Sequence, residues 1–587
     1  MSYSAPLDEM IFTLRAVADC ARLTVLPEFA MLDVSEEALV ELLQPAAQLA
    51  ERSVAPSNRS GDRQGAALVD GRVELAPAVT RALCDVLQGG WNGATMPNDV
   101  GGFGLPESVG TAVMEMWNSA NMAMALNPML TIGAALALLA HASSEQIERY
   151  VPKMISGEWS GTMNLTEPAA GSDLGRISMQ AERCGDFYRL RGQKIFITWG
   201  EHEATSNIVH LVLARTPDAP PGTRGISLFI VPKFLVNADG SLGDRNDVQC
   251  VSLEHKLGIH SSPTCVMSFG DRDGAVGYLV GSENQGLAYL FTMMNEARLK
   301  VGLQGLAIAE GAHQQALTYA RERVQGSDAQ GCPAPIVRHA DVQRMLLTQR
   351  ALIQAMRALA YTEAVYVDFA RHAQDTEARA GAQRRVDLMV PIVKGWLTEL
   401  GQEVANLGIQ IHGGMGFIEE TGAAQWLRDV RIAAIYEGTN GIQALDLLGR
   451  KVLRDEARAL SEWLAQMTEC DQAIASVQPA LQREVELFRA SRNELAVSCQ
   501  HLLARGRVDS DGTKAGAFDF MMQCGYVYGA WQSLRILALL ADDGGERARA
   551  RCAAARFYLD RILPRAAQHA QSLRADTSYW GEAGLLA

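Results

Sequence analysis

The sequence lacks the cysteine and histidine patterns that build metal sites or disulfide frameworks. Its ten cysteines are scattered, no two of them have CxxC spacing, and no cysteine–histidine cluster has the spacing of a zinc site. Isolated thiols of this kind are typical of proteins in a reducing compartment. We therefore expect free, buried cysteines and no metal site.

Positive charge is also scarce. The chain has 53 lysines and arginines against 67 aspartates and glutamates, which gives a formal net charge of -14 at pH 7. This balance argues against nucleic acid or an anionic membrane as the main partner. The opening "MSYSAPLDEMIFTL" has no basic start followed by an apolar core, so it resembles neither a signal peptide nor a transit peptide. We expect a soluble, cytoplasmic protein that binds no nucleic acid.

The chain has no long uninterrupted apolar run and no dinucleotide fingerprint. Its most apolar segment, "MAMALNPMLTIGAALALLAHA" (residues 122–142), is interrupted by Asn127 and Pro128. This interruption predicts a buried helical hairpin rather than a membrane span. No GxGxxG motif follows a strand, which argues against a Rossmann-type nicotinamide site.

What is present is enough apolar sequence for three or four domains. The residues are 48% hydrophobic, and a chain of 587 residues is too long for a single core. The segment "SEEALVELLQ" has helical spacing and offers Ser35 as its N-cap, whereas "DFYRLRGQKIFITWG" and "GISLFIVPKF" are typical of strands. We expect a mainly helical fold with a central β domain, divided into residues 1–35 (N-terminal extension), 36–157 (helical domain), 158–285 (β domain), 286–450 (four-helix bundle) and 451–587 (additional helical domain).

One carboxylate stands out in the segment "RIAAIYEGTNGIQALDL", residues 431–447. Glu437 lies between an apolar Ile-Tyr pair and a Gly-Thr-Asn-Gly turn. An acid near a helix N-terminus is favoured by the helix dipole, which is the simpler interpretation. The other interpretation is a catalytic base at the mouth of an apolar pocket. These residues alone leave both open.

Three other segments combine small or polar residues with apolar neighbours. "MNLTEPAAGSD" ends a strand near Thr166 and continues into a small-residue loop, which is either a ligand-contacting loop or an ordinary Gly-Ser loop. "IFITWG" places Thr198 at the end of a strand, where threonine is common without any function. "IQIHGGMGF" puts two glycines after His412, which favours a close backbone approach to another group.

The order of the segments resembles that of one family. "LTEPAAGSD", "IFIT", "NEARLKVGLQGLA", "QIHGGMGF" and "IYEGTNGIQ" follow one another as in the acyl-CoA dehydrogenases, flavoproteins that oxidise acyl-CoA thioesters. The resemblance covers about residues 80–450. The opening "YSAPLDEMIFTL" and the helical module after residue 450 resemble the long bacterial branch that includes 3-methylthiopropanoyl-CoA dehydrogenases.

The resemblance implies a fold, a cofactor and partners. The family fold has an N-terminal helical domain, a β-barrel-like middle domain and a C-terminal four-helix bundle, to which this chain adds a helical domain. FAD is expected between the β domain and the bundle, partly covered by a neighbouring subunit. The expected partners are therefore an acyl-CoA substrate, a second copy in a homodimer, and an electron-transferring flavoprotein as electron acceptor.

The resemblance also implies a reaction. Glu437 matches the family's catalytic base, which removes the α-proton of the thioester while a hydride leaves the β-carbon for flavin N5. The backbone N–H of Glu437 and the FAD ribityl 2′-hydroxyl are expected to hold the thioester carbonyl. The product is a trans-2-enoyl-CoA. Gly438 leaves room for the substrate beside the base.

The remaining expected site residues are assigned by their match to the family segments. Thr166 is expected to hydrogen-bond the isoalloxazine ring, and Arg323 to reach the FAD diphosphate of the partner subunit. The sequence departs from the family at Met163, where an aromatic residue is common, and in "RVQGS" after Arg323. The FAD-contacting residues are expected to be Met163, Leu165, Thr166, Ser172, Phe196, Ile197, Thr198, Arg323, Gln410, Gly413, Gly414, Thr439 and Gly441. The substrate-contacting residues are expected to be Ser172, Asn295, Arg298 and Gly438.

Several alternatives remain open at this point. Arg298 is either a CoA-side residue or a solvated helix charge, and Trp199 either narrows the space near the flavin or packs under a loop. An acyl-CoA oxidase would share the first half-reaction. A nucleic-acid-associated flavoprotein of the same fold would need a basic surface, for which "RARARCAAAR" is the sole basic cluster. The sequence does not fix the acyl group.

Overall fold

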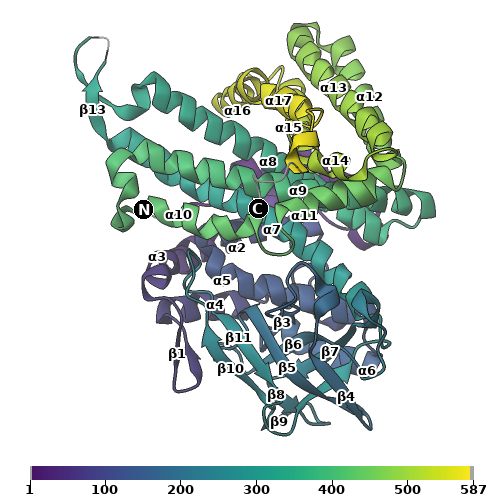
Figure 1. Ribbon diagram of the computed structural model, residues 1–587. Coiled ribbons are helices and arrows are strands. Elements are labelled where there is room, and N and C mark those ends of the chain that lie inside the picture. Colours follow the sequence, from purple (N-terminus) through teal and green to yellow (C-terminus); the bar gives the residue numbers. More distant parts are fainter. Residues whose placement is uncertain (1–2, 329, 582–587) are drawn as a thin grey trace.

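The protein consists of a helical part and a sheet-containing part that lie one above the other (Figure 1). The computed structural model describes residues 3–328 and 330–581. The long helix α5 lies between the two parts, since it contacts both strand β3 of the sheet and helix α7 of the bundle. This arrangement confirms the predicted class, a mainly helical protein with a central β domain.

The first helical region begins with an N-terminal segment that packs on distant parts of the chain. The side chain of Ser35 caps the second helix by accepting a hydrogen bond from the Ala38 N–H, as its sequence predicted. Glu9 in the first helix forms ion pairs with Arg350 and Arg551. The elements are α1 (Leu7–Phe12), α2 (Glu36–Leu49), α3 (Ala55–Gln64), β1 (Ala67–Val69), β2 (Arg72–Glu74), α4 (Pro77–Gln88), α5 (Glu107–His141) and α6 (Ser144–Ile155).

The predicted helical hairpin at residues 122–142 is wrong. The structure has one helix there, α5, whose backbone is non-helical only at Asn121. Asn127 and Pro128 form no turn because both are buried inside the helix, where Asn127 donates to the Ser160 hydroxyl at 3.3 Å. Within residues 3–328 and 330–581, α5 is the one helix long and apolar enough to cross a membrane, and 89% of its apolar stretch is buried inside the protein.

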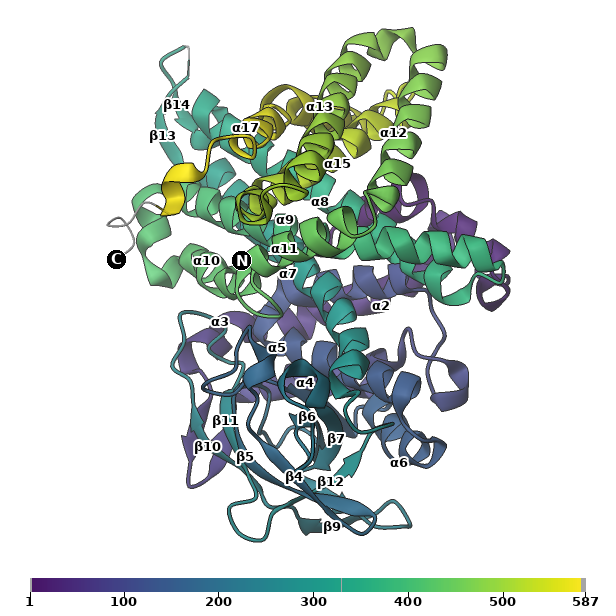
Figure 2. The ribbon, with the colours of Figure 1, turned by 45° about the vertical axis from the view of Figure 1, so that its right-hand side comes forward.

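The sheet contains eight strands in the order β10-β11-β5-β12-β7-β6-β3, and β4 adds to β5. Its pairs are antiparallel except that β3 runs parallel to β6. Figure 2 shows this sheet curving beneath α4 and α5. The strands are β3 (Trp159–Asn164), β4 (Gln180–Cys184), β5 (Phe187–Thr198), β6 (Asn207–Ala214), β7 (Ser227–Pro232), β10 (Val248–Leu253), β11 (Thr264–Phe269) and β12 (Ala275–Leu279), with a separate pair β8 (Phe234–Val236) and β9 (Leu242–Arg245).

Long helices form the bundle above the sheet. A buried charge cluster joins the bundle to α5, because Arg357 forms ion pairs with Glu115 on α5 and Glu310 on α7. A hairpin projects from the bundle in both views (Figures 1 and 2). The elements are α7 (Gly286–Glu322), β13 (Val324–Ser327), β14 (Pro333–Pro335), α8 (Ala340–His372), α9 (Thr376–His412), α10 (Ala423–Val430) and α11 (Asn440–Asp446).

The C-terminal helices pack closely on the bundle. A Cβ at Gly525 of α15 would lie 2.2 Å from the Trp396 ring, and one at Gly395 would lie 2.3 Å from Met521. The backbones of α9 and α15 therefore approach each other where glycine faces a large side chain. The elements are α12 (Arg458–Val477), α13 (Gln482–Gly506), α14 (Ser510–Ala515), α15 (Ala517–Leu539), α16 (Glu546–Phe557) and α17 (Pro564–Ser572).

Candidate active site

Glu437 lies in a strained turn between a short 3-10 segment (Arg431–Ala434) and α11. Its φ is 55° and that of Gly438 is 86°, so two consecutive residues adopt the left-handed conformation. This conformation is uncommon for a glutamate. The φ of Gly438 favours glycine there, and a Cβ would lie 2.7 Å from Gln443 Nε2. The helix cap is Thr439, whose hydroxyl accepts from the Ile442 N–H. The cap interpretation therefore does not explain Glu437.

Side chains from two neighbouring helices hold the backbone of this turn. Arg298 on α7 donates from Nε to the Glu437 carbonyl at 3.3 Å, and from NH1 to Asn295 at 3.5 Å. Gln443 on α11 donates to the Glu437 carbonyl at 3.4 Å and the Gly438 carbonyl at 3.3 Å. Arg298 is buried rather than a solvated helix charge. The structure thus brings four sequence-predicted residues together: Glu437, Gly438, Arg298 and Asn295.

The environment of Glu437 opposes its ionisation. Desolvation raises the pKa of the Glu437 carboxyl above its ordinary value, and the charges of Arg298 and Lys394 partly offset that rise. A poorly solvated carboxylate is a stronger base than one in water, while the two nearby cations favour its ionised form. The site can therefore remove a weakly acidic proton from a bound molecule.

A row of contacting side chains joins this turn to α7 and α5. Tyr436 donates its hydroxyl to Gln304 on α7, and Gln304 Nε2 lies 3.6 Å from the Met129 sulfur on α5. Gln304 is fully buried. This row ties the residue before Glu437 to two long helices. Sequence reasoning did not find it, because the three residues come from three separate segments.

The strand ends supply a second group of predicted residues. Met163 is buried in β3, while Leu165 and Thr166 are half-buried just after it. The Thr166 carbonyl accepts from the Ile195 N–H of β5 at 2.9 Å, which brings the two strand ends together. The following loop carries Ser172, which is exposed.

A buried ion pair anchors this loop. Glu167 accepts from Lys194 Nζ at 2.8 Å, from the Ser178 N–H and hydroxyl at 2.7 Å each, and from the Met179 N–H at 3.1 Å. Lys194 is fully buried, and burial lowers its pKa to about 8. The loop from residue 167 to 178 is therefore fixed at both ends by one carboxylate.

The end of β5 is shaped to receive a flat apolar group. Phe196 has a φ of 61° and leaves 57% of its surface exposed, whereas Ile197 is buried and Thr198 half-buried. Thr264 of β11 lies opposite Thr198, and its buried hydroxyl has no hydrogen-bond partner among the described residues. An uncovered aromatic side chain beside polar groups without partners fits the edge of a ring system such as isoalloxazine.

Trp199 packs under neighbouring segments rather than facing open space. Its side chain is fully buried, and its Nε1 donates to the Ala123 carbonyl of α5 at 3.1 Å. Its backbone N–H donates to the Pro263 carbonyl at 2.7 Å. Of the two interpretations left open by the sequence, packing is the one that these contacts support.

The remaining predicted residues lie on the surface of this chain. Gln410, Gly413 and Gly414 at the end of α9 are exposed, and a Cβ at either glycine would meet no atom within 4 Å. Arg323 ends α7 at the base of the projecting hairpin and is also exposed. Gly441 is exposed and Thr439 half-buried at the start of α11. The exposed members of this group at the end of α9 and at the hairpin therefore face solvent in a single chain.

Lys394 and Asn440 belong to the site although sequence reasoning passed over them. Lys394 Nζ donates to Asn440 Oδ1 at 2.8 Å, and its charge acts on Glu437. A lysine in the apolar run "VPIVKGW" was the available signal, since lysine is rarely buried without a reason.

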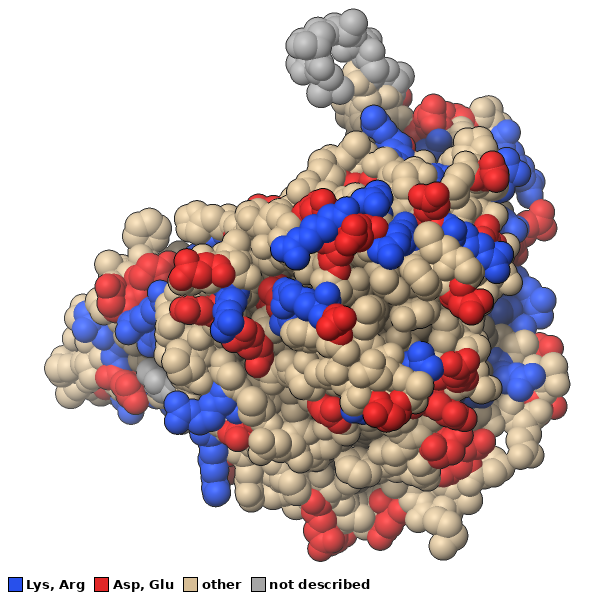
Figure 3. Space-filling model, turned by 90° about the horizontal axis from the view of Figure 1, so that it is seen from below, with Lys and Arg blue, Asp and Glu red and all other residues tan. Residues whose placement is uncertain are grey.

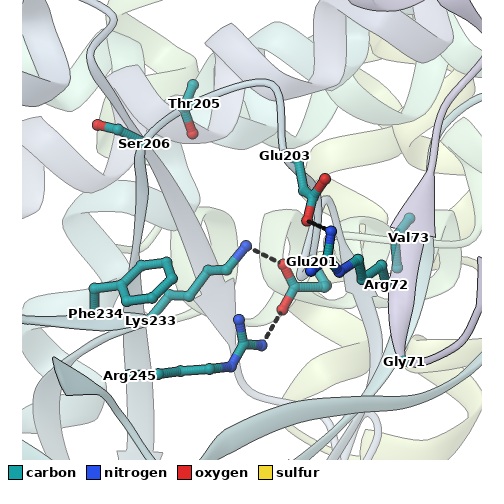
Figure 4. Close-up of a pocket in the computed structure, with 10 residues that line it drawn as sticks. All are labelled: Gly71, Arg72, Val73, Glu201, Glu203, Thr205, Ser206, Lys233, Phe234 and Arg245. Carbon is teal, nitrogen blue, oxygen red and sulfur yellow. Dashed lines mark hydrogen bonds and ion pairs between the residues drawn. The ribbon is translucent and has the colours of Figure 1, made fainter.

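A polar cavity of about 230 Å³ opens elsewhere on the β domain (Figure 4). Lys233 and Arg245 both point to Glu201, and Arg72 points to Glu203. These charges neutralise one another, and the cavity contains none of the residues predicted from the sequence. It is lined by Gly71, Arg72, Val73, Glu201, Glu203, Thr205, Ser206, Lys233, Phe234 and Arg245.

Four family models together match most of the chain. They describe the N-terminal domain of acyl-CoA dehydrogenases (residues 36–158), the middle domain (162–272), the C-terminal domain (284–453) and an acetyl-CoA dehydrogenase C-terminal-like domain (459–579). The third of these matches contains Glu437, Arg298 and Lys394.

Individual proteins resemble the chain over most of its length. A 3-methylmercaptopropionyl-CoA dehydrogenase of Ruegeria pomeroyi is 45% identical over 96% of both chains. A butyryl-CoA dehydrogenase of Syntrophomonas wolfei is 38% identical over 70% of both chains. The crystal structure of an acyl-CoA dehydrogenase complexed with FAD from Bacillus anthracis, 22% identical, superimposes with a TM-score of 0.74 over 92% of this chain and 88% of that one.

Proposed function

This chain belongs to the acyl-CoA dehydrogenase family, and from that premise we propose that it is an FAD-dependent enzyme that converts an acyl-CoA thioester to the trans-2-enoyl-CoA. The observation that carries the proposal is the position of Glu437. It is a carboxylate with a raised pKa, its strained turn is held by Arg298, and the preceding Tyr436 is hydrogen-bonded to the buried Gln304.

The residues around the turn have different proposed roles in proton removal. Glu437 takes the α-proton, and its desolvated site makes the carboxylate basic enough to do so. The backbone N–H of Glu437 is the proposed donor to the thioester carbonyl, which stabilises the charge that develops there. Gly438 admits the thioester next to the base, and Arg298 with Asn295 lies on the proposed CoA side.

The strand ends and the exposed residues are the proposed cofactor site. FAD, when bound, supplies the acceptor for the hydrogen that leaves the β-carbon with its electron pair. Phe196, Ile197 and Thr198 would lie along its ring, with Thr166 as a hydrogen-bond donor. The other residues proposed to hold FAD are Met163, Leu165, Ser172, Arg323, Gln410, Gly413, Gly414, Thr439 and Gly441.

A homodimer is the proposed assembly. Met415, Phe417 and Ile418 follow the glycine pair and leave 46%, 87% and 44% of their surfaces exposed. A run of apolar side chains in water is typical of a covered interface. Together with the exposed Arg323 at the projecting hairpin, this run supports a second copy that completes each FAD site. An electron-transferring flavoprotein is the proposed electron acceptor.

We propose a short acyl chain, with 3-methylthiopropanoyl-CoA as the first candidate. The name of the Ruegeria pomeroyi relative supports that thioester. The row of Tyr436, Gln304 and Met129 next to Glu437 supports a short pocket, because Gln304 and Met129 are buried and the three side chains contact one another.

The two alternative functions receive different support. An oxidase remains the second candidate, since its proton-removal step needs the same residues. The nucleic-acid alternative is weakened because three of the four arginines in the basic cluster on α16 are paired with acids: Arg547 with Asp8, Arg551 with Glu9, and Arg556 with Glu484. On the face drawn in Figure 3, basic and acidic side chains are interspersed.

An anaerobic absorbance titration tests the proposal. The FAD-loaded protein is titrated with butanoyl-, octanoyl-, branched and 3-methylthiopropanoyl-CoA, and the Glu437→Gln variant is titrated beside it. We expect a short thioester to bleach the flavin in the parent and not in the variant. Bleaching that persists in the variant would refute Glu437 as the base. Oxygen uptake during turnover would favour the oxidase.

A further inference from the structure

Lys394 is an exception among the buried lysines. Four lysines among the described residues are buried, and three of them face a glutamate: Lys194 with Glu167, Lys233 with Glu201 and Lys300 with Glu296. Lys394 is fully buried too, yet it forms no ion pair with any carboxylate in the described part of the chain. Its hydrogen bond goes to the neutral side chain of Asn440.

Leaving a buried ammonium without a carboxylate is costly. Burial lowers the pKa of Lys394 to about 7, although Glu437 and Glu399 attract its charge, and Arg298 repels it. The opposite side of α9 is apolar, since Gly395 and Trp396 pack against α15. A sequence that needed only a filled core would place an apolar residue here.

Asn440 links this lysine to the turn of the base. It is the first residue of α11, three positions after Glu437. Its Oδ1 accepts from Lys394, and its Nδ2 donates to Glu399 at 2.7 Å and to the Thr398 hydroxyl at 3.0 Å. The start of α11 is therefore held by side chains from successive turns of α9.

We propose that Lys394 is a positioning residue for the base, fixing through Asn440 the turn that carries Glu437 and keeping the Glu437 carboxylate ionised in its apolar site. The inference rests on the proposed role of Glu437. Lys394 acts through other groups and does not itself touch the substrate. Arg298 holds the same turn from α7 through the Glu437 carbonyl, so cations from two different helices restrain the segment that carries the carboxylate.

Two neutral variants separate the charge from the hydrogen bond. Lys394→Met removes both, whereas Lys394→Gln keeps a donor for Asn440 and removes the charge. Lys451→Met is the matched control, because Lys451 pairs with Asp387 of α9 near the surface, 3.2 Å apart. All variants are prepared as full-length, FAD-loaded protein.

The measurement is an infrared titration of the Glu437 carboxyl. The protonated-carboxyl band that is lost in Glu437→Gln identifies the group, and its midpoint is followed with pH in each variant. We expect Lys394→Gln and Lys394→Met to raise this midpoint by about 1 pH unit or more, the effect of removing a nearby opposite charge. Lys451→Met should leave it unchanged. The acid limb of kcat/KM should move by the same amount.

The outcomes distinguish this inference from the proposed function. A midpoint that does not move in Lys394→Gln overturns the role of the lysine, even where the parent oxidises a thioester. If the midpoint moves in Lys394→Gln but the parent oxidises no thioester, the role of the lysine stands and the dehydrogenase proposal is refuted. If Lys394→Met is not recovered folded, Lys394→Gln decides alone.

Discussion

The Glu167–Lys194 pair offers the most direct test of how this fold prepares its cofactor site. In Glu167→Gln, Lys194 keeps its full burial and loses its ion-pair partner. Removing one member of a buried pair costs about 3–5 kcal/mol, since the other charge is left uncompensated. The glutamate also holds the loop from 167 to 178 through Ser178 and Met179.

We expect two measurable effects in Glu167→Gln. The free energy of unfolding in urea should fall by about 3 kcal/mol or more. FAD affinity should fall by about 100-fold, because the loop must be reordered when FAD binds and every 1.4 kcal/mol is tenfold. The affinity is measured from the quenching of FAD fluorescence by the apoprotein.

The stability lost in Glu167→Gln should change with pH in one direction. Lys194 has a pKa of about 8 in the folded protein against 10.5 for the ordinary side chain. Between these values the unfolded chain holds a proton that the folded chain has released, so stability rises with pH. Without Glu167 the pKa of Lys194 in the folded protein falls further. The pH range over which the variant gains stability with rising pH therefore extends below pH 8. The difference in free energy of unfolding between variant and parent should therefore shrink as the pH rises to about 8 and change little above it, where both gain stability alike.

The double variant Glu167→Gln/Lys194→Met is the control. It leaves no buried charge without a partner at this pair, so it should recover a large part of the stability lost in the single variant. FAD affinity should stay low, because the loop contacts remain absent. A double variant as unstable as the single one, or a loss independent of pH, would refute this account.

Three further predictions concern the base, the pocket and the C-terminal helices. Glu437→Gln should lower the rate of flavin bleaching by about 10²–10⁴-fold without changing thermal stability beyond a few degrees, as followed by stopped-flow absorbance and calorimetry; an unchanged rate contradicts it. Gln304→Ala should raise the kcat/KM ratio of octanoyl-CoA over 3-methylthiopropanoyl-CoA by about 10-fold or more, because it removes a fully buried side chain that contacts the neighbour of Glu437; an unchanged ratio places the acyl chain elsewhere. Gly525→Leu should cost about 1–3 kcal/mol in urea unfolding, since even its Cβ would lie 2.2 Å from Trp396, whereas Gly544→Ala, which meets no atom within 4 Å, should cost far less.

The sequence was least informative where several segments meet. Asn127 and Pro128 predicted a hairpin, yet α5 continues through them because its surroundings are buried on every side. Trp199 could be assigned to packing only once Ala123 of α5 was seen beside it. In both cases the outcome depended on contacts with distant segments, which a local sequence pattern does not show.

The sequence by itself determined the class of the fold and the family. Three local patterns can be identified without knowledge of distant contacts. They are the helical spacing, the strand-like composition of residues 158–285 and the order of five short segments. The segment around Glu437 also identified the candidate base. Ser35 and the acids directly after it were enough to predict the helix cap.

Only the tertiary structure decided which groups surround the base. Arg298, Lys394 and Gln304 are separated from Glu437 by 139, 43 and 133 positions, so no periodic pattern links them to it. Their effect depends on burial and on distance, because charges and hydrogen bonds act strongly only where water is excluded. The sequence supplied the carboxylate, and the packing of α7, α9 and α11 around it supplied the environment that raises its pKa.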